Sequence, residues 1–342
     1  MDRKTTSRRD ALSPLVSVII PAYNAEQFIE QAIQSVLNQT FQAYEIIVVD
    51  DGSTDKTQEI LRGFTGQIHC IFQQNCGPSS ARNAGINIAQ GEYIGFLDAD
   101  DLWTPNKLEV QLDYMKRHPD IALVCSDHQD FDVEGDLPGS WLGSKSLFED
   151  SHITEGPIRN AFLRLIQENF ISTPTVILKK ACFEEIGGFD EEIWSVEDRD
   201  LWLRISASFT IACIPKIFCK RRRHQSNISK RQGELTLKGR IRVLEKNWRL
   251  FPGLVPDLIW RRELAEYYFN LGCLRLQKGE RWRAFQAVSK NLLYAAAMVL
   301  SDRSLAVRPT LKSLGLLCGV IVGWQVSRFF GRSWKNAVHI ML

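Results

Sequence analysis

The chain lacks the sequence features of several common functional classes. Its eight cysteines form no Cys-x-x-Cys pair, which disfavours a zinc site or a redox pair and indicates reduced thiols. No Gly-x-Gly-x-x-Gly segment is present, so a nicotinamide-dependent oxidoreductase is disfavoured. The chemistry of the chain must therefore reside in polar clusters of another kind.

Long apolar stretches are also absent. Residues 1–13 are polar and lack the apolar core of a signal peptide, and we expect them to be flexible. The longest apolar stretch, residues 314–326, is shorter than the roughly 20 residues that a membrane-spanning helix needs. We therefore expect no secretion, no clear transmembrane helix and a cytoplasmic location.

The net charge of +2 hides an asymmetry along the chain. Residues 1–229 contain 22 Lys and Arg against 33 Asp and Glu, whereas residues 230–342 contain 20 against 7. A basic C-terminal part of this kind suggests contact with an anionic surface. Nucleic acid is a poor candidate for that surface, because the polar clusters of the N-terminal part are acidic.

Apolar runs alternate with segments of helical spacing through most of the chain, which predicts an α/β fold with a largely parallel sheet. Buried strands are predicted at residues 15–20, 46–49, 68–72, 93–97, 121–125, 175–178 and 211–218. Helices are predicted at residues 25–37, 55–64, 78–89, 107–117 and 198–206. From about Gly233 the pattern is helical, with an antiparallel pair at residues 264–279 and 281–298.

Polar clusters follow three of the predicted strands, at residues 21–24, 50–55 and 98–101. Ligands in such sheets bind outside the carboxyl ends of the strands, so we expect these clusters to meet in one crevice. The first two offer groups for a nucleotide. Asp51 can accept a hydrogen bond from a base or a ribose, and capping of the next helix by Ser53 or Thr54 is compatible with that role.

The third cluster contains Asp98, Asp100 and Asp101 within four residues. Like charges this close repel and raise one another's pKa, and a hard divalent cation would cancel the repulsion. Such cations are usually held by one or two carboxylates together with substrate phosphates. The cluster therefore points to a phosphate-bearing ligand, with an acidic helix-capping turn as the alternative.

Arg82 lies on a short predicted helix whose start faces the same crevice, where a guanidinium can bridge a diphosphate and a carboxylate. Glu197 and Asp198 begin a later helix, a position that keeps a carboxylate ionised and suits a general base. Plain helix capping by Asp198 is the competing explanation.

The basic run of Arg222, Arg223 and His224 fits a diphosphate leaving group, which gains charge as its bond breaks. A basic surface loop is the alternative explanation for this run.

Taken in order, seven motifs resemble those of the family 2 glycosyltransferases, over roughly residues 14–229. They are PAYN, VVDDGSTD, GPSSARNAG, GEYIGFLDADD, GGFDE, EDRDLWLR and RRHQSNIS. The resemblance implies a Rossmann-like GT-A domain with a mixed, mostly parallel sheet at residues 14–229, followed by a basic α-helical region at residues 230–342. It also implies inverting transfer of a sugar from a nucleotide-diphosphate donor, helped by Mn²⁺ or Mg²⁺, in polysaccharide or glycolipid synthesis.

The same resemblance assigns roles by position. The residues expected to hold the donor nucleotide are Pro21, Tyr23, Asn24, Asp51, Arg82 and Asp98. Those expected at the departing diphosphate are Arg222, Arg223 and His224. Asp198 would be the catalytic base and Asp100 the metal ligand, with Glu197 and Asp101 in support. The family often has a tyrosine where this chain has Arg221.

Several alternatives remain open. The chain could be a sugar-nucleotide-binding or scaffold protein without transfer activity. It could also be a sugar nucleotidyltransferase, although such enzymes have a glycine-rich basic loop where this chain reads PAYNAEQF. The donor could carry UDP, GDP or dTDP, and the acceptor could be a carbohydrate or lipid-linked. The C-terminal helices, with five of the nine tryptophans, could cap the catalytic domain or lie on an anionic membrane.

Overall fold

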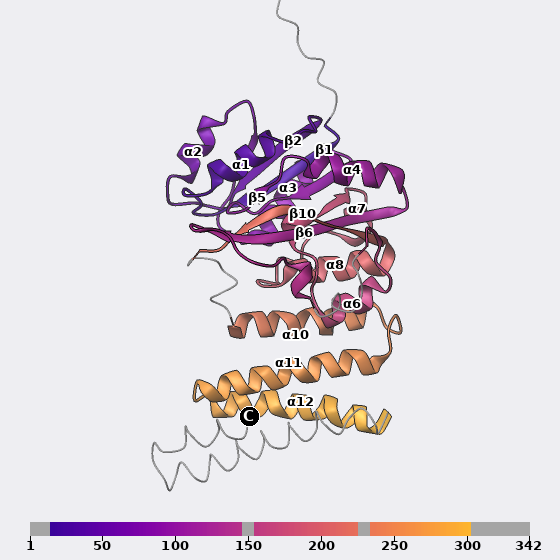
Figure 1. Ribbon diagram of the computed structural model, residues 1–342. Helices are drawn as coiled ribbons and strands as arrows, with labels where there is room; N and C mark the ends of the chain where they lie inside the picture. The colour runs from indigo at the N-terminus through magenta and orange to yellow at the C-terminus, as the bar shows by residue number, and fades with distance from the viewer. Residues whose placement is uncertain (1–13, 146–153, 225–232, 302–342) are drawn as a thin grey trace, which may run out of the picture. The chain divides into compact units, whose positions relative to one another are not determined.

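The computed structural model describes residues 14–145, 154–224 and 233–301, with side chains as far as Met298. The chain divides into two compact units, Met1–Asn227 and Ile228–Leu342. The first is an α/β unit, and the described part of the second is helical (Figure 1).

The first unit is built on a ten-stranded mixed sheet with the order β3-β2-β1-β4-β9-β6-β10-β5, in which β7 also pairs with β6 and β8 with β10. The parallel part contains β1 (Val16–Ala22), β2 (Tyr44–Asp50), β3 (His69–Phe72) and β4 (Tyr93–Phe96). Antiparallel β9 (Ile177–Lys179) joins it to β6 (Ile121–Asp132) and β10 (Thr210–Arg222), which are parallel to each other. Three short antiparallel strands complete the sheet: β5 (Leu102–Trp103), β7 (Gly135–Asp136) and β8 (Gly156–Pro157).

Helices cover both faces of the sheet because β1 is apolar on both sides. Val16, Val18 and Ile20 belong to one core cluster. This cluster also includes side chains of α1 (Ile29–Leu37), α2 (Thr57–Gly63) and α4 (Lys107–Arg117). Ile19 points the other way, as strand alternation requires, and contacts Gly85 of α3 (Pro78–Ile88). The predicted mixed α/β fold is thus confirmed.

Two strands extend well beyond their predicted ends. β6 continues to Asp132 and β10 to Arg222. The added residues are mainly polar or charged, so they lack the apolar signal on which the prediction relied. Residues 132–158, for which no strand or helix was predicted, contain β7, β8 and a short 3₁₀ turn at Leu142–Ser144, while residues 146–153 lie outside the described part of the chain.

Short helices between β8 and β10 were not predicted individually. They are α6 (Ala161–Gln167) and α7 (Cys182–Ile186), with a 3₁₀ turn at Thr173–Thr175 between them. Each spans two turns or fewer, too little chain to show a helical period. The predicted helix near residue 198 is α8 (Glu197–Ser208).

The second unit contains α10 (Gly233–Leu250), α11 (Asp257–Gln277) and α12 (Arg281–Ser301). A three-residue link makes α11 and α12 antiparallel neighbours, as predicted. α11 begins earlier than predicted, directly after Pro256, whose fixed φ suits a helix start. No helix in the described part combines the length and the apolar character needed to cross a membrane; the apolar stretch 314–326 lies outside that part.

The close approach of α3 to β1 gives a stability test. A Cβ on Gly85 would lie 2.5 Å from Ile19 Cγ2, closer than two carbons can pack. Gly85→Ala should therefore lower the free energy of unfolding by about 1–3 kcal/mol, the usual range for overpacking. Gly63→Ala is the matched control, because a Cβ there meets nothing within 4 Å. Equal unfolding midpoints in urea for the two variants would refute this packing account.

Candidate active site

Arg82 joins three of the sequence motifs. Its side chain lies on α3 and is only 5% exposed. Nη2 donates to Asp98 Oδ1 at 2.9 Å, and Nη1 donates to Glu197 Oε1 at 2.7 Å. Burial by itself would lower the pKa of Arg82, but the two carboxylates outweigh it and raise that pKa. The structure therefore brings the end of β4, α3 and the start of α8 together around one buried cation.

A second set of contacts holds α3 against the GGFDE motif. Asn83 donates through Nδ2 to the Phe189 carbonyl and accepts the Phe189 N–H at Oδ1, both at 2.9 Å. The guanidinium of Arg82 lies 5.3 Å from the Phe189 ring centroid, a cation–π distance. Asn83 and Phe189 were not predicted as site residues, because their only signal was their position within two recognised motifs.

Asp198 lies next to Glu197 and is half-buried. Its Oδ2 accepts from Asn169 Nδ2 at 3.1 Å and its Oδ1 from the Arg199 N–H at 2.7 Å. Burial, followed by the negative charge of Glu197, raises the pKa of Asp198 to about 6. Val196, just before the pair, has a φ of +62°, a strained conformation for a β-branched residue that is often found at functional sites.

The remainder of the EDRDLWLR motif is structural. Arg199 Nε and Nη2 donate to the carbonyls of Leu165 and Ile166 on α6. Arg204 pairs with Asp200 at 2.9 Å and also donates to the carbonyl of Gly188. These buried contacts fix α8, so that its first two residues are presented to the site.

Asp100 and Asp101 contact the end of β10. His224 Nε2 lies 2.9 Å from Asp100 Oδ2, and the Arg222 N–H donates to Asp101 Oδ1 at 2.9 Å. Arg222 Nε also donates to the Asp100 carbonyl at 3.0 Å. Burial and the neighbouring aspartates raise the pKa of both Asp100 and Asp101, although His224 and Arg222 oppose the shift. The structure thus gathers Asp98, the aspartates that follow it, and two of the predicted leaving-group residues.

The donor set at Asp98 and Asp100 suits a hard divalent cation. Both carboxylates are partly exposed, at 34% and 29% of their side chains, and Asp98 contributes to the raised pKa of Asp100. In the described ranges no group of three or more His, Cys, Asp or Glu side chains could hold a metal ion by itself. Mg²⁺ is usually bound by one or two protein carboxylates together with phosphate groups of the substrate.

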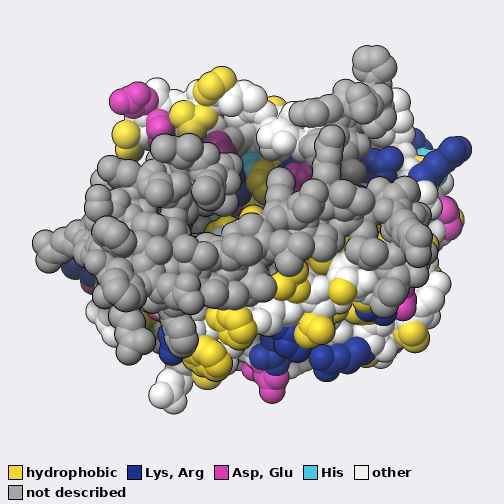
Figure 2. Space-filling model, turned by 90° about the horizontal axis from the view of Figure 1, so that it is seen from below, with side chains coloured by type: hydrophobic (Ala, Val, Ile, Leu, Met, Phe, Trp, Pro, Cys, Tyr) yellow, Lys and Arg dark blue, Asp and Glu magenta, His cyan; other side chains and the backbone are white. Residues whose placement is uncertain are grey.

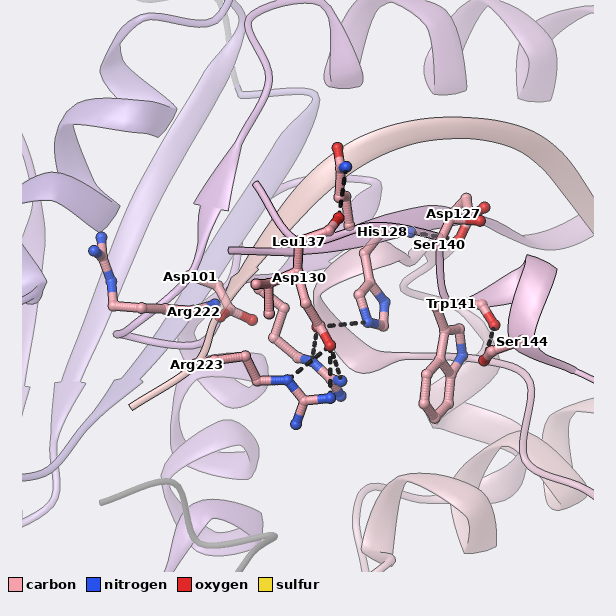
Figure 3. Close-up of polar contacts among 12 residues, drawn as sticks. Asp101, Asp127, His128, Asp130, Leu137, Ser140, Trp141, Ser144, Arg222 and Arg223 are labelled. Carbon is pink, nitrogen blue, oxygen red and sulfur yellow. Dashed lines mark hydrogen bonds and ion pairs between the residues drawn. The ribbon is translucent and has the colours of Figure 1, made fainter. Parts of the chain in front are cut away.

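Arg223 is not brought to this group. Figure 3 shows Arg222 pointing away from the Asp130 carboxylate and Arg223 pointing towards it. Arg223 Nε donates to Asp130 Oδ2 at 2.7 Å, and Arg221 Nε donates to Asp130 Oδ1 at 2.7 Å. Side chains alternate along a strand, so Arg221 and Arg223 lie on the face opposite to Arg222. Asp130 was not predicted, because it lies in a part of β6 that was not predicted as strand.

The predicted nucleotide side lies at the ends of β1 and β2. Asp51 is 4% exposed, and its carboxylate accepts from Gln73 Nε2 and from the N–H groups of Cys76 and Gly77 at 2.7–2.9 Å. The carboxylate therefore fixes the loop that leads into α3.

The β1 end is more open. Pro21 is half-buried in β1, whereas Tyr23 is 52% exposed. Asn24 has a φ of +48° and accepts from the Thr54 N–H at 2.8 Å. These contacts join the first two polar clusters, as the strand-end argument predicted.

Comparisons with known proteins agree with this architecture. The model of glycosyl transferase family 2 matches residues 17–184. An uncharacterized glycosyltransferase of Rickettsia typhi is 32% identical over 224 residues, covering 64% of this chain and 67% of that protein. The chain therefore belongs to glycosyltransferase family 2.

Other relatives are longer. The chondroitin synthase of Escherichia coli is 30% identical over 237 residues, covering 68% of this chain and 32% of the synthase. The chain likewise spans 28% of the length of a Rickettsia bellii glycosyltransferase, with 39% identity over 208 residues.

Solved structures share the fold. S. aureus TarS in complex with UDP-GlcNAc superposes with a TM-score of 0.65 at 19% identity, covering 92% of this chain and 93% of that one. Mannosyltransferase PcManGT from Pyrobaculum calidifontis, in complex with GDP-Man and Mn²⁺, gives a TM-score of 0.54 at 16% identity and covers 94% and 89%. The GT-A fold expected from the motifs is confirmed.

Removing the buried guanidinium should be costly. Arg82→Met would leave Asp98 and Glu197 without their shared partner, and we expect a loss of about 3 kcal/mol in the free energy of unfolding. Arg117→Met is the control, because its i,i+4 pair with Asp113 is more than half exposed on both sides and contributes at most about 0.5 kcal/mol. Urea unfolding measures both, and a similar loss in the two variants would contradict the central role of Arg82.

Proposed function

We propose that the protein is an inverting glycosyltransferase that moves a sugar from a nucleotide-diphosphate donor to a hydroxyl acceptor. The observation that carries the proposal is that Arg82 forms two ion pairs, one with Asp98 and one with Glu197. They hold Asp98, a donor-side carboxylate, and Glu197, the neighbour of a candidate base, on one buried cation.

Relatives support a sugar-nucleotide donor and a polymeric product. Structures with the same fold bind UDP-GlcNAc and GDP-Man, and one relative is a chondroitin synthase. We accordingly propose a UDP-, GDP- or dTDP-sugar as donor, and an acceptor in polysaccharide or glycolipid synthesis. A screen of nucleoside diphosphates by thermal stabilisation, with Mn²⁺ or Mg²⁺ present, would identify the base.

The donor would lie along the ends of β1, β2 and β4. Tyr23 offers an exposed ring and Pro21 a half-buried one for the base, with Asn24 and Asp51 shaping the adjoining loops. Asp98 would face the ribose. Arg82 is within hydrogen-bond distance of Asp98, and it contributes positive charge near the diphosphate.

Asp100 would hold a divalent cation together with the phosphates of the donor. When bound, such an ion supplies Lewis-acid stabilisation of the departing diphosphate. His224 and Arg222, which contact Asp100 in this structure, add hydrogen-bond donors and positive charge on the same side. We leave Arg223 out of this group, because its guanidinium binds Asp130.

Asp198 is proposed as the base. It takes the proton of the acceptor hydroxyl, whose oxygen forms a new bond to the anomeric carbon. The bond from that carbon to the diphosphate oxygen breaks on the opposite side, and its electron pair leaves with the nucleotide. One displacement inverts the configuration and requires a single base. The Asn169 amide orients the Asp198 carboxylate.

Replacing the base tests this assignment. Asp198→Asn keeps the shape of the side chain but cannot take a proton, so transfer should fall by about 100-fold or more. Donor binding, followed by thermal shift, should be preserved. Asp113→Asn, an exposed carboxylate on α4, should leave both properties unchanged. Near-normal turnover of Asp198→Asn would show that another group is the base.

The raised pKa of Asp198 predicts the pH dependence. The base must be ionised, so kcat/KM should fall as the pH drops through about 6. Glu197→Gln removes the neighbouring negative charge and should lower the pKa of Asp198, moving this acidic limb to lower pH. A limb that stays in place in Glu197→Gln would contradict the electrostatic coupling of the pair.

We also propose that the second unit binds an anionic membrane surface. On α12, Trp282 and Leu293 are 62% and 66% exposed, and Arg281, Arg283 and Lys290 belong to the same helix. On the face drawn in Figure 2, Lys and Arg side chains lie beside exposed hydrophobic ones. Exposed aromatic and apolar groups among cations are typical of interfacial helices.

Vesicle flotation tests the membrane proposal. Vesicles containing phosphatidylglycerol should carry the protein, whereas vesicles of phosphatidylcholine alone should not. Trp282→Ser should weaken the flotation. Phe72→Ser, which replaces a 53% exposed aromatic residue of the first unit, should leave it unchanged. Equal effects of the two substitutions, or equal binding to neutral vesicles, would rule out this attachment.

A further inference from the structure

The end of β10 is a crowded run of charge that pairs with β6 as far as Arg222. Lys220, Arg221, Arg222 and Arg223 are consecutive, and His224 follows. β5 pairs with β10 at Cys219 and Lys220. Beyond that point β6 is the strand that continues beside β10, with Arg221 opposite Asp130 and Arg222 opposite Phe131. Neighbouring cations repel one another, so the geometry of this strand end needs further contacts.

Asp130 supplies those contacts on one face. Its carboxylate accepts from Arg221 Nε and Nη2 at 2.7 and 3.1 Å, and from Arg223 Nε at 2.7 Å. The three side chains are between 22% and 33% exposed, so solvent screens these bonds only in part. Burial opposes ionisation, but both arginines outweigh it and lower the pKa of Asp130. The carboxylate is therefore charged.

The carboxylate is itself held in place. The backbone carbonyl of Asp130 accepts the Leu137 N–H at 2.8 Å, which closes the hairpin between β6 and β7. Arg221 lies 5.3 Å from the ring centroid of Trp141, and that ring stacks on the buried His128. The structure thus presents Asp130 to the end of β10 from a fixed strand (Figure 3).

We propose that Asp130 is a positioning residue for the diphosphate site. By binding Arg221 and Arg223 on one face of β10, it fixes the strand end that carries Arg222 and His224 on the other face. This inference rests on the proposed function of the site, because it assumes that Arg222 and His224 meet the diphosphate. Asp130 itself is not expected to touch the substrate.

The test separates the diphosphate from the nucleoside. For the nucleoside diphosphate selected by the thermal screen, binding to Asp130→Asn should weaken about tenfold, the scale of one lost charge-assisted hydrogen bond. Binding of the parent nucleoside, measured by ligand-observed NMR, should be unchanged. The ratio of the two dissociation constants does not depend on the fraction of folded protein, so a merely structural loss would not move it.

Asp136→Asn is the matched control. The substitution removes the exposed ion pair between Asp136 and Lys220, which directly precedes Arg221 on β10. It should leave the dissociation constants of the diphosphate and of the nucleoside unchanged. Should Asp130→Asn fail to fold, Arg223→Gln removes one of the two contacts and should also selectively weaken diphosphate binding.

Other outcomes overturn the inference. Unchanged diphosphate binding in Asp130→Asn would refute it, and so would an equal weakening for diphosphate and nucleoside. In either case the proposed function would still stand if the wild-type protein binds a nucleoside diphosphate and transfers a sugar. Wild-type protein that binds none of the nucleotides would refute both the function and this inference.

Discussion

The site depends on one buried cation. A guanidinium on a side chain that is only 6% exposed is costly to bury unless it is paired and hydrogen-bonded, and Arg82 meets this requirement with Asp98 and Glu197. The end of β4 and the start of α8 must therefore reach α3 for the fold to be stable. The position of Asp198 follows from this constraint, because it is the next residue along the chain from Glu197.

Each recognised motif combines chemical and structural residues. In EDRDLWLR, the first two positions belong to the site, whereas Arg199 and Arg204 bind backbone carbonyls of α6 and of the GGFDE segment. In GPSSARNAG, Arg82 carries the charge and Asn83 holds the backbone of Phe189. Motif recognition alone cannot separate the two kinds of residue, because both are specified by the same fold.

The sequence predicted most of the first half of the sheet, where apolar strands end in polar clusters. It failed where strands are polar: the last parts of β6 and β10 carry acidic and basic residues that form pairs across the two strands. The contact of Arg223 with Asp130 was missed for the same reason, since the alternation of side chains becomes visible only once residue 223 is known to follow a strand. Asn169 and Asp130 were missed because their partners are 29 and 91 or more residues away.

The ion pair of Arg82 with Glu197 also bears on how the chain folds. It closes a loop of 115 residues, whereas the pair with Asp98 closes one of 16. Closing the longer loop costs more chain entropy than closing the shorter one, because loop-closure entropy grows with loop length. A chain that has formed β1 to β4 but not yet docked α8 therefore holds a half-neutralised guanidinium. Docking of Glu197, which brings Asp198 with it, and full pairing of the buried guanidinium therefore depend on the same contact.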